Sequence, residues 1–212
     1  MVEYRFLKAG KKEHIETLHR EGLLYLNTWD YFKKDTSNPE RGDPYEGTTQ
    51  SLKTNAIPQT KENGNWHTLG KITQIRKDAE DRDDYNLFCL YTIYYPKLDQ
   101  DNFLIIDERF KTLGEYFLFI LDGNEFINRV KKVLSQKEIP HNSGLVNYLD
   151  VSKHNGELDA FTKDIRFSYQ NEYRFFVHTK QKKECIFSIG DISDISIIIP
   201  SDKLSKSIRV TY

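Results

Sequence analysis

The order of apolar and polar positions divides the chain into an N-terminal unit, a polar middle stretch and a strand-rich second half. Residues 2–7 alternate between apolar and polar side chains, which is the period of a β-strand. Residues 11–20 have the spacing of a short helix, and Gly22 can end it. Residues 23–28 then predict a second strand, so the unit is strand, helix, strand.

The middle stretch, residues 33–86, is rich in Lys, Asp, Asn, Gly and Thr and has few apolar anchors. This composition predicts an excursion made mostly of loops, with a charged stretch at 76–84 that favours a helix. Loops of more than about 15 residues in a compact domain are usually functional or mobile. For any single residue there, a solvated insertion is the simpler interpretation.

The second half predicts more strands than helices. Phe126, Ile127, Val130 and Leu134 lie on one side of a predicted helix over residues 123–136. We therefore expect an α+β fold with mainly antiparallel sheets and few helices. The predicted strands are residues 87–95, 116–121, 145–151, 172–179, 184–189, 195–199 and 208–212.

Composition limits the class of protein without naming an activity. The chain has 212 residues and a mass of 25.1 kDa, which predicts a single domain over residues 1–212. Lys and Arg number 31 and Asp and Glu 32, a balance that makes nucleic acid a disfavoured partner. We expect a cytoplasmic protein, because the chain shows no membrane-spanning run, no secretory leader and only two isolated cysteines. The sequence has no Cys/His cluster of the kind that predicts a zinc site.

The segment around residue 172 is the most informative in the chain. From Gln170 onward the residues alternate, so that Gln170, Glu172 and Arg174 share one face. A carboxylate on a rigid strand beside an amide can hold a sugar hydroxyl and stabilise developing positive charge. The alternative is a solvent-facing strand on which Glu172 and Arg174 form an ion pair, which contributes only about 0–1 kcal/mol.

Arg5, on the first predicted strand, is a candidate of a different kind. Its planar guanidinium suits a phosphate or diphosphate, while an ordinary surface ion pair is an equally good interpretation.

Two short motifs and their order resemble a known family. The chain has Gly42-Asp43-Pro44-Tyr45-Glu46 after the second strand, then Phe161-Thr162-Lys163 and Tyr169-Gln170-Asn171-Glu172-Tyr173-Arg174. With an early Tyr4-Arg5 strand, these resemble uncharacterised bacterial and phage proteins grouped with the ADP-ribosyltransferase superfamily. The resemblance implies an ADP-ribosyltransferase-like fold and transfer of ADP-ribose from NAD⁺, or NAD⁺ hydrolysis, with no metal.

The resemblance also implies roles for individual residues. Glu172 corresponds to the catalytic glutamate that holds the ribose 2′-hydroxyl and supports an oxocarbenium-like transition state. Gln170, two residues earlier, corresponds to the residue that helps to engage the acceptor of the ADP-ribose. A second protein could be that acceptor. Because nicotinamide is a good leaving group, such a site need only position the ring and stabilise a cation.

The remaining implied residues bind NAD⁺. Arg5 would contact its phosphates or ribose, and Thr28 would brace the glutamate from the second strand. Tyr25 and Tyr31 would stack on the nicotinamide. On this basis Arg5, Thr28 and Glu172 are expected to converge on one cleft.

Other classes of function stay open. A non-catalytic module on the same scaffold could recognise a nucleotide or a protein through residues 33–86. A nuclease is disfavoured by the neutral charge and by the lack of an acidic metal cluster, since Asp81, Asp83 and Asp84 fit a solvated face.

Overall fold

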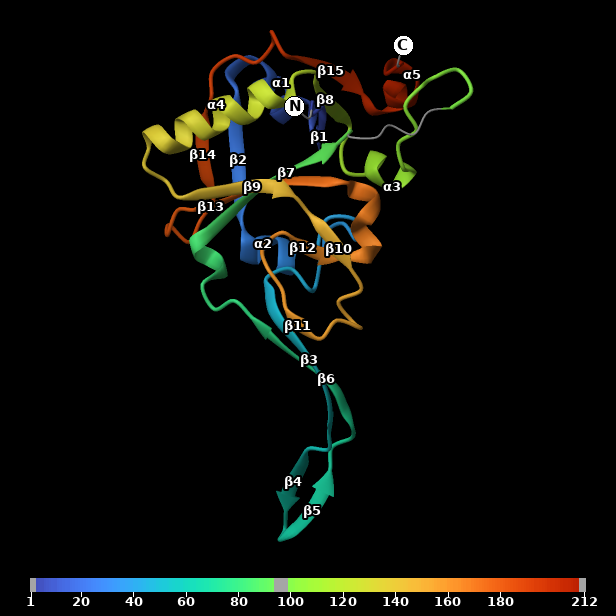
Figure 1. Ribbon diagram of the computed structural model, residues 1–212, viewed down its shortest axis with the longest axis vertical. Helices are drawn as coiled ribbons and strands as arrows, with labels where there is room; N and C mark the ends of the chain where they lie inside the picture. The colour runs from blue at the N-terminus through green and yellow to red at the C-terminus, as the bar shows by residue number, and fades with distance from the viewer. Residues whose placement is uncertain (1–2, 94–98, 210–212) are drawn as a thin grey trace.

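The computed structural model describes residues 3–93 and 99–209, and shows a sheet-based body from which a long two-stranded ribbon projects (Figure 1). The ends of three predicted strands, at residue 2, residues 94–95 and residues 210–212, lie outside the described residues. In the described part, no helix has both the length and the apolar character needed to cross a bilayer.

The main sheet is organised around β7 (Tyr85–Thr92). Along one side, β13 (Glu172–His178) pairs with the whole of β7. On the other side, two strands share it: β2 (Leu23–Thr28) pairs with its beginning and β1 (Phe6–Gly10) with its end. The sheet therefore splits on this side of β7, because β1 and β2 pair with different strands beyond it.

The outer strands complete the sheet, and all of its pairings are antiparallel. Beyond β1 lie β8 (Tyr116–Ile120) and β15 (Ser196–Pro200). Beyond β2 lies β14 (Cys185–Ser188), and beyond β13 lies β9 (His141–Leu145). The expectation of an α+β protein with mainly antiparallel sheets is confirmed. Three short strands of the second half lie outside this sheet: β10 (Asn147–Leu149), β11 (Gly156–Glu157) and β12 (Thr162–Asp164).

Helices and apolar side chains cover both faces of the sheet. On one face, α1 (Lys12–Glu21) and α4 (Gly123–Gln136) pack their apolar sides against strand residues such as Phe175. On the other, α3 (Glu108–Lys111) and α5 (Leu204–Ser207) enclose a second apolar cluster. Burial of these apolar side chains away from water is the main contribution to the stability of the body.

The predicted helices have clear start and stop signals. α4 has the predicted bounds, because the Asp122 side chain accepts a hydrogen bond from the Glu125 amide at 2.9 Å and caps its first turn. Gly22 ends α1 in the left-handed conformation at φ 56°, as predicted, and a Cβ there would lie 2.0 Å from the Gly190 carbonyl oxygen.

The middle stretch differs from the prediction of loops. After α2 (Trp29–Lys34), the chain forms β3 (Thr48–Ala56), which pairs with β6 (Ile72–Asp78). At the far end, β4 (Gln59–Glu62) pairs with β5 (Asn65–Thr68). The prediction failed because backbone pairing holds these strands together while their side chains stay largely exposed, so no alternation of burial marks the sequence.

Three boundaries also differ. The charged stretch at 76–84 was expected to be helical, but it divides between β6 and a 3₁₀ turn at Arg82–Asp84. β1 begins at Phe6 rather than residue 2, so Arg5 precedes the strand. β13 begins at Glu172, and Gln170 ends a 3₁₀ helix (Ile165–Gln170) instead of belonging to the strand.

Candidate functional site

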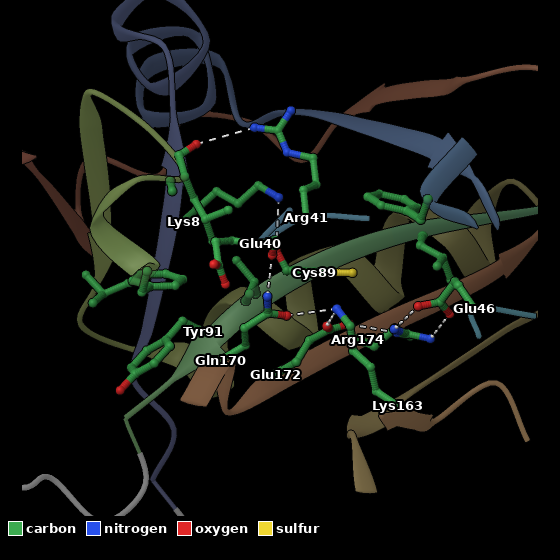
Figure 2. A pocket seen from close by; sticks show the side chains of 17 residues that line it. Lys8, Glu40, Arg41, Glu46, Cys89, Tyr91, Lys163, Gln170, Glu172 and Arg174 are labelled. Carbon is green, nitrogen blue, oxygen red and sulfur yellow. Dashed lines mark hydrogen bonds and ion pairs between the residues drawn. The ribbon is translucent and has the colours of Figure 1, made fainter. Parts of the chain in front are cut away.

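A pocket lies at the split of the main sheet. Its walls come from β1, α3, the middle of β7, the beginning of β13 and the loop that precedes β3. The cavity measures about 120 Å³. Figure 2 shows Lys8, Arg41, Gln170 and Glu172 directed toward this space from different elements. The pocket thus lies where segments far apart in sequence meet.

The floor of the pocket is a buried ion-pair network centred on Arg174. Its guanidinium is 1% exposed and donates from Nε to Glu172 Oε1 at 2.7 Å. The same group reaches Glu46, with Nη1 at 2.7 Å from Oε1 and Nη2 at 3.1 Å from Oε2. A two-pronged contact of this kind fixes the orientation of both partners. Arg174 therefore joins the loop before β3 to β13.

Lys163 extends the network on its other side. Its Nζ donates to Glu172 Oε2 at 3.0 Å and to Gln170 Oε1 at 2.8 Å. Both carboxylate oxygens of Glu172 therefore already have a cationic partner, Lys163 or Arg174. The Glu172–Arg174 ion pair matches one of the two predicted interpretations, but the pair is buried instead of facing solvent.

The charges of this network stabilise one another. Burial alone would raise the pKa of the Glu172 carboxyl, but the adjacent Arg174 and Lys163 outweigh it and hold that pKa well below its usual range. Burial would likewise lower the pKa of Lys163, and the carboxylates of Glu172 and Glu46 reverse the shift and raise it. Glu172 is therefore ionised at neutral pH.

Local backbone geometry brings Gln170 and Glu172 together although they belong to different elements. Asn171 between them adopts the left-handed conformation at φ 46°, and its side chain donates to the Thr92 carbonyl at 3.1 Å. Asn tolerates this region better than most residues. As a result both flanking side chains reach Lys163.

The loop that carries Glu46 is held from two sides. Gly42 packs so closely on the end of α2 that a Cβ would lie 1.8 Å from the Asp35 carbonyl oxygen. Trp29 Nε1 donates to Glu46 Oε1 at 2.6 Å. Asp43 is buried and accepts from the Tyr45 amide at 2.9 Å, and burial raises the pKa of its carboxyl. These contacts hold Glu46 against Arg174.

Two other cations at the pocket donate their hydrogen bonds to carbonyl oxygens and not to carboxylates. Lys8 Nζ donates to the Cys89 carbonyl oxygen at 2.9 Å, and burial lowers the pKa of this ammonium. Arg41 Nη2 donates to the Leu113 carbonyl oxygen at 3.4 Å, and its Nη1 is 4.0 Å from Asp35. The neighbouring Cys89 thiol is no competing anion, because burial raises its pKa to about 12.

The pocket consequently has an excess of positive charge. Its lining contains four cationic side chains, Lys8, Arg41, Lys163 and Arg174, and three carboxylates, Glu40, Glu46 and Glu172. Each carboxylate is already bound: Glu172 and Glu46 by the network, and Glu40 by a hydrogen bond from the Tyr169 hydroxyl. Lys8 and Arg41 remain available to an anion.

The structure brings two of the six predicted site residues to this pocket, Gln170 and Glu172. Arg5 is instead half-exposed and pairs with Glu3 at 3.4 Å. The Thr28 hydroxyl accepts from the Tyr31 amide at 3.2 Å and caps α2, so it is used within its own segment. The expected convergence of Arg5, Thr28 and Glu172 on one cleft is not seen.

The two predicted stacking residues also lie elsewhere. Tyr25 is exposed because the alternation of β2 turns it away from the buried Leu24 and Leu26. Tyr31 lies on the exposed side of α2, with its ring edge-on to Phe32. Neither belongs to the lining of the pocket.

Sequence reasoning missed several residues that shape the pocket. Lys8 fell beyond the predicted end of the first strand, although it shares a strand face with Phe6. Glu46 and Lys163 belong to the two sequence motifs, but the sequence assigned neither of them a role. Their signal is that Glu46 directly follows Tyr45 and Lys163 comes two residues after Phe161, so each charged residue lies near an aromatic one.

Comparisons with protein-family models, with curated proteins and with solved structures found no match to this chain.

Proposed function

We propose that the pocket binds the phosphate group of a small molecule, such as NAD⁺ or a related nucleotide. The observation that carries this proposal is the pair of cations, Lys8 and Arg41, that face the cavity with carbonyl oxygens as their hydrogen-bond partners. A buried ammonium without a carboxylate is costly, and an anion bound beside it offsets that cost. Arg adds a planar fork of donors suited to phosphate oxygens.

The size of the cavity limits what enters it. Sites for drug-sized ligands have volumes of roughly 300–1,000 Å³, whereas this cavity measures about 120 Å³. A phosphate or diphosphate fits this scale better than a whole dinucleotide. The rest of a nucleotide would then lie over the rim, where the side chain of Arg41 is 41% exposed.

Calorimetric titration with ADP-ribose and with pyrophosphate tests this proposal. We expect Lys8→Met to weaken binding roughly 10- to 100-fold, the loss of one hydrogen bond to a charged group. Lys11→Met is the matched control, since Lys11 is exposed at the start of α1. This variant should bind both ligands as tightly as the unmodified protein does. Absence of binding, or equal affinity in the Lys8→Met variant, contradicts the proposal.

ADP-ribosyl transfer or NAD⁺ hydrolysis is a second candidate, supported by Glu172 and Gln170 in the lining beside these cations. In such a reaction the bond between nicotinamide and ribose breaks, nicotinamide leaves, and an acceptor or water attacks the ribose carbon. Glu172 would support the oxocarbenium-like ribose. For that role one of its oxygens must exchange Lys163 or Arg174 for the ribose hydroxyl.

Release of nicotinamide from labelled NAD⁺ tests this second candidate. We expect Glu172→Gln to reduce turnover by at least ~10²-fold, as is typical when a positioned catalytic group is lost. Circular dichroism should show that the variant is folded, and Arg5→Ala, outside the pocket, serves as an active control. No nicotinamide release by the unmodified protein, or equal release by the folded Glu172→Gln variant, excludes the assignment.

A further inference from the structure

The ribbon formed by residues 48–78 is a second candidate for binding, separate from the pocket. At its base, β11 of the body pairs with β3 beside Gln50 and Ser51. Beyond this point it extends away from the body as two antiparallel strands, first β3 and β6 and then β4 and β5 at the tip (Figure 1). At the tip, every residue of β4 and β5 is exposed. An isolated two-stranded hairpin is at best marginally stable in water, so a projecting ribbon points to a partner that covers it.

The ribbon is strongly basic. Residues 48–78 contain five Lys and Arg residues and two Asp and Glu residues, a net charge of +3, so the remainder of the chain carries −4. One of the two acids, Asp78, is already paired with Lys33 at 2.5 Å in the body. The balanced total charge of −1 therefore hides a basic arm on an acidic body.

The cations of the ribbon are free of carboxylates. No ion pair is formed by any of the five within the described chain, and all five side chains belong to exposed residues. Two of them lie over aromatic rings: Arg76 over Tyr45 at 4.6 Å, and Lys61 over Trp66 at 5.7 Å from the ring centroid. The cationic residues run from base to tip and are Lys77, Arg76, Lys53, Lys71 and Lys61.

Near its tip the ribbon also exposes apolar side chains. Trp66 is 65% exposed, whereas the other tryptophan of the chain, Trp29, is 4% exposed. Ile57 and Leu69, which precede β4 and follow β5 in the sequence, are also exposed. Aromatic and apolar side chains at the end of a basic arm are suited to contact the faces and methyl groups of bases.

We propose that this ribbon binds duplex DNA by lying in the major groove. That groove is about 12 Å wide and admits a two-stranded β-ribbon. The five cations would contact phosphates, and the exposed Thr, Asn and Gln side chains of the strands would meet base edges. The −4 charge of the remaining chain is repelled by DNA, so contact would be confined to the ribbon.

Two other partners fit the ribbon less well. The tip would be the first part of the ribbon to contact a membrane. Its turn, from Glu62 to Asn65, has no apolar side chain and includes a carboxylate, which disfavours insertion among lipids. The major groove of duplex RNA is deep and narrow, which excludes a ribbon of this kind. A second copy of the chain, with its acidic body, is the remaining alternative, and the experiment distinguishes it.

Fluorescence anisotropy with a labelled duplex of about 20 bp, at salt from about 50 to 200 mM, tests the proposal. The triple variant Lys53→Gln, Lys61→Gln, Lys71→Gln should bind at least ~10-fold more weakly at the lowest salt and reduce the slope of log K against log salt by about 3. A matched control replaces the exposed Lys131, Lys132 and Lys182 of the body with Gln and should bind as the unmodified protein does.

Tryptophan emission locates the contact, because Trp66 is the exposed one of the two. DNA should quench the emission of the unmodified protein, and Trp66→Phe should abolish that response. The proposal is overturned if the duplex does not bind, if the triple variant and the control bind equally, or if binding leaves Trp66 emission unchanged. Tighter binding of an RNA duplex would also overturn it. The proposal is also overturned if sedimentation shows that the unmodified protein is a dimer and the triple variant a monomer. The ribbon would then bind a second copy of the chain.

Discussion

At the scale of single residues, the protein depends on a guanidinium that joins distant parts of the chain. Arg174 binds Glu172, two residues away, and Glu46, which is 128 residues away. Replacing a whole buried ion pair with apolar residues is often neutral, but removing one partner leaves an unpaired buried charge. This network therefore makes the fold sensitive to single substitutions at Arg174.

We expect Arg174→Met to lower the free energy of unfolding by about 3–5 kcal/mol, because Glu46 and Glu172 each lose their closest cation. Urea denaturation measures this directly. Arg5→Met is the control, since Arg5 is half-exposed and such surface changes usually stay within about 0.5 kcal/mol. If the two variants unfold at the same urea concentration, the network does not stabilise the fold.

The sequence allowed part of this site to be predicted. Glu172 and Gln170 stood out because charged and amide groups recur beside a run of aromatic residues. Lys8 and Arg41 could not be found in this way, because what distinguishes them is that carbonyl oxygens accept their hydrogen bonds beside the cavity, and only tertiary structure shows this. Arg5 was misleading because the strand begins only at Phe6, so that Arg5 lies before it with a half-exposed side chain paired with Glu3.

At the scale of elements, burial decided what was predictable. α4 matched its predicted bounds because a capping aspartate and an apolar stripe both mark it. β13 showed its buried face, Tyr173, Phe175 and Val177, as strict alternation. β3 to β6 bury little, so their sequence resembles that of loops even though their backbones are paired.

The ribbon should be separable from the body. Replacing residues 55–72 with Asn-Gly joins Thr54 to Thr73, the next positions beyond the Lys53–Gln74 pair, through a two-residue turn. We expect the melting temperature to change by no more than about 4 °C, the effect of ~1 kcal/mol in a domain of this size. Scanning calorimetry checks this. A larger loss of stability would show that the distal ribbon supports the body.

At the scale of the whole molecule, two separate features present positive charge. The pocket has it at Lys8 and Arg41, inside the split of the sheet, and the ribbon has it along an exposed arm. The total charge of −1 predicted neither, because composition averages over acidic and basic surfaces that the fold separates. Each feature can be tested without disturbing the other.

The central claim is that the pocket at the split holds a phosphate group between Lys8 and Arg41. A crystal structure of the protein with ADP-ribose tests it most directly. We predict density for a phosphate within hydrogen-bond distance, about 2.7–3.2 Å, of both Lys8 Nζ and the Arg41 guanidinium. An empty pocket at saturating ADP-ribose, or a phosphate bound elsewhere on the protein, would contradict the account.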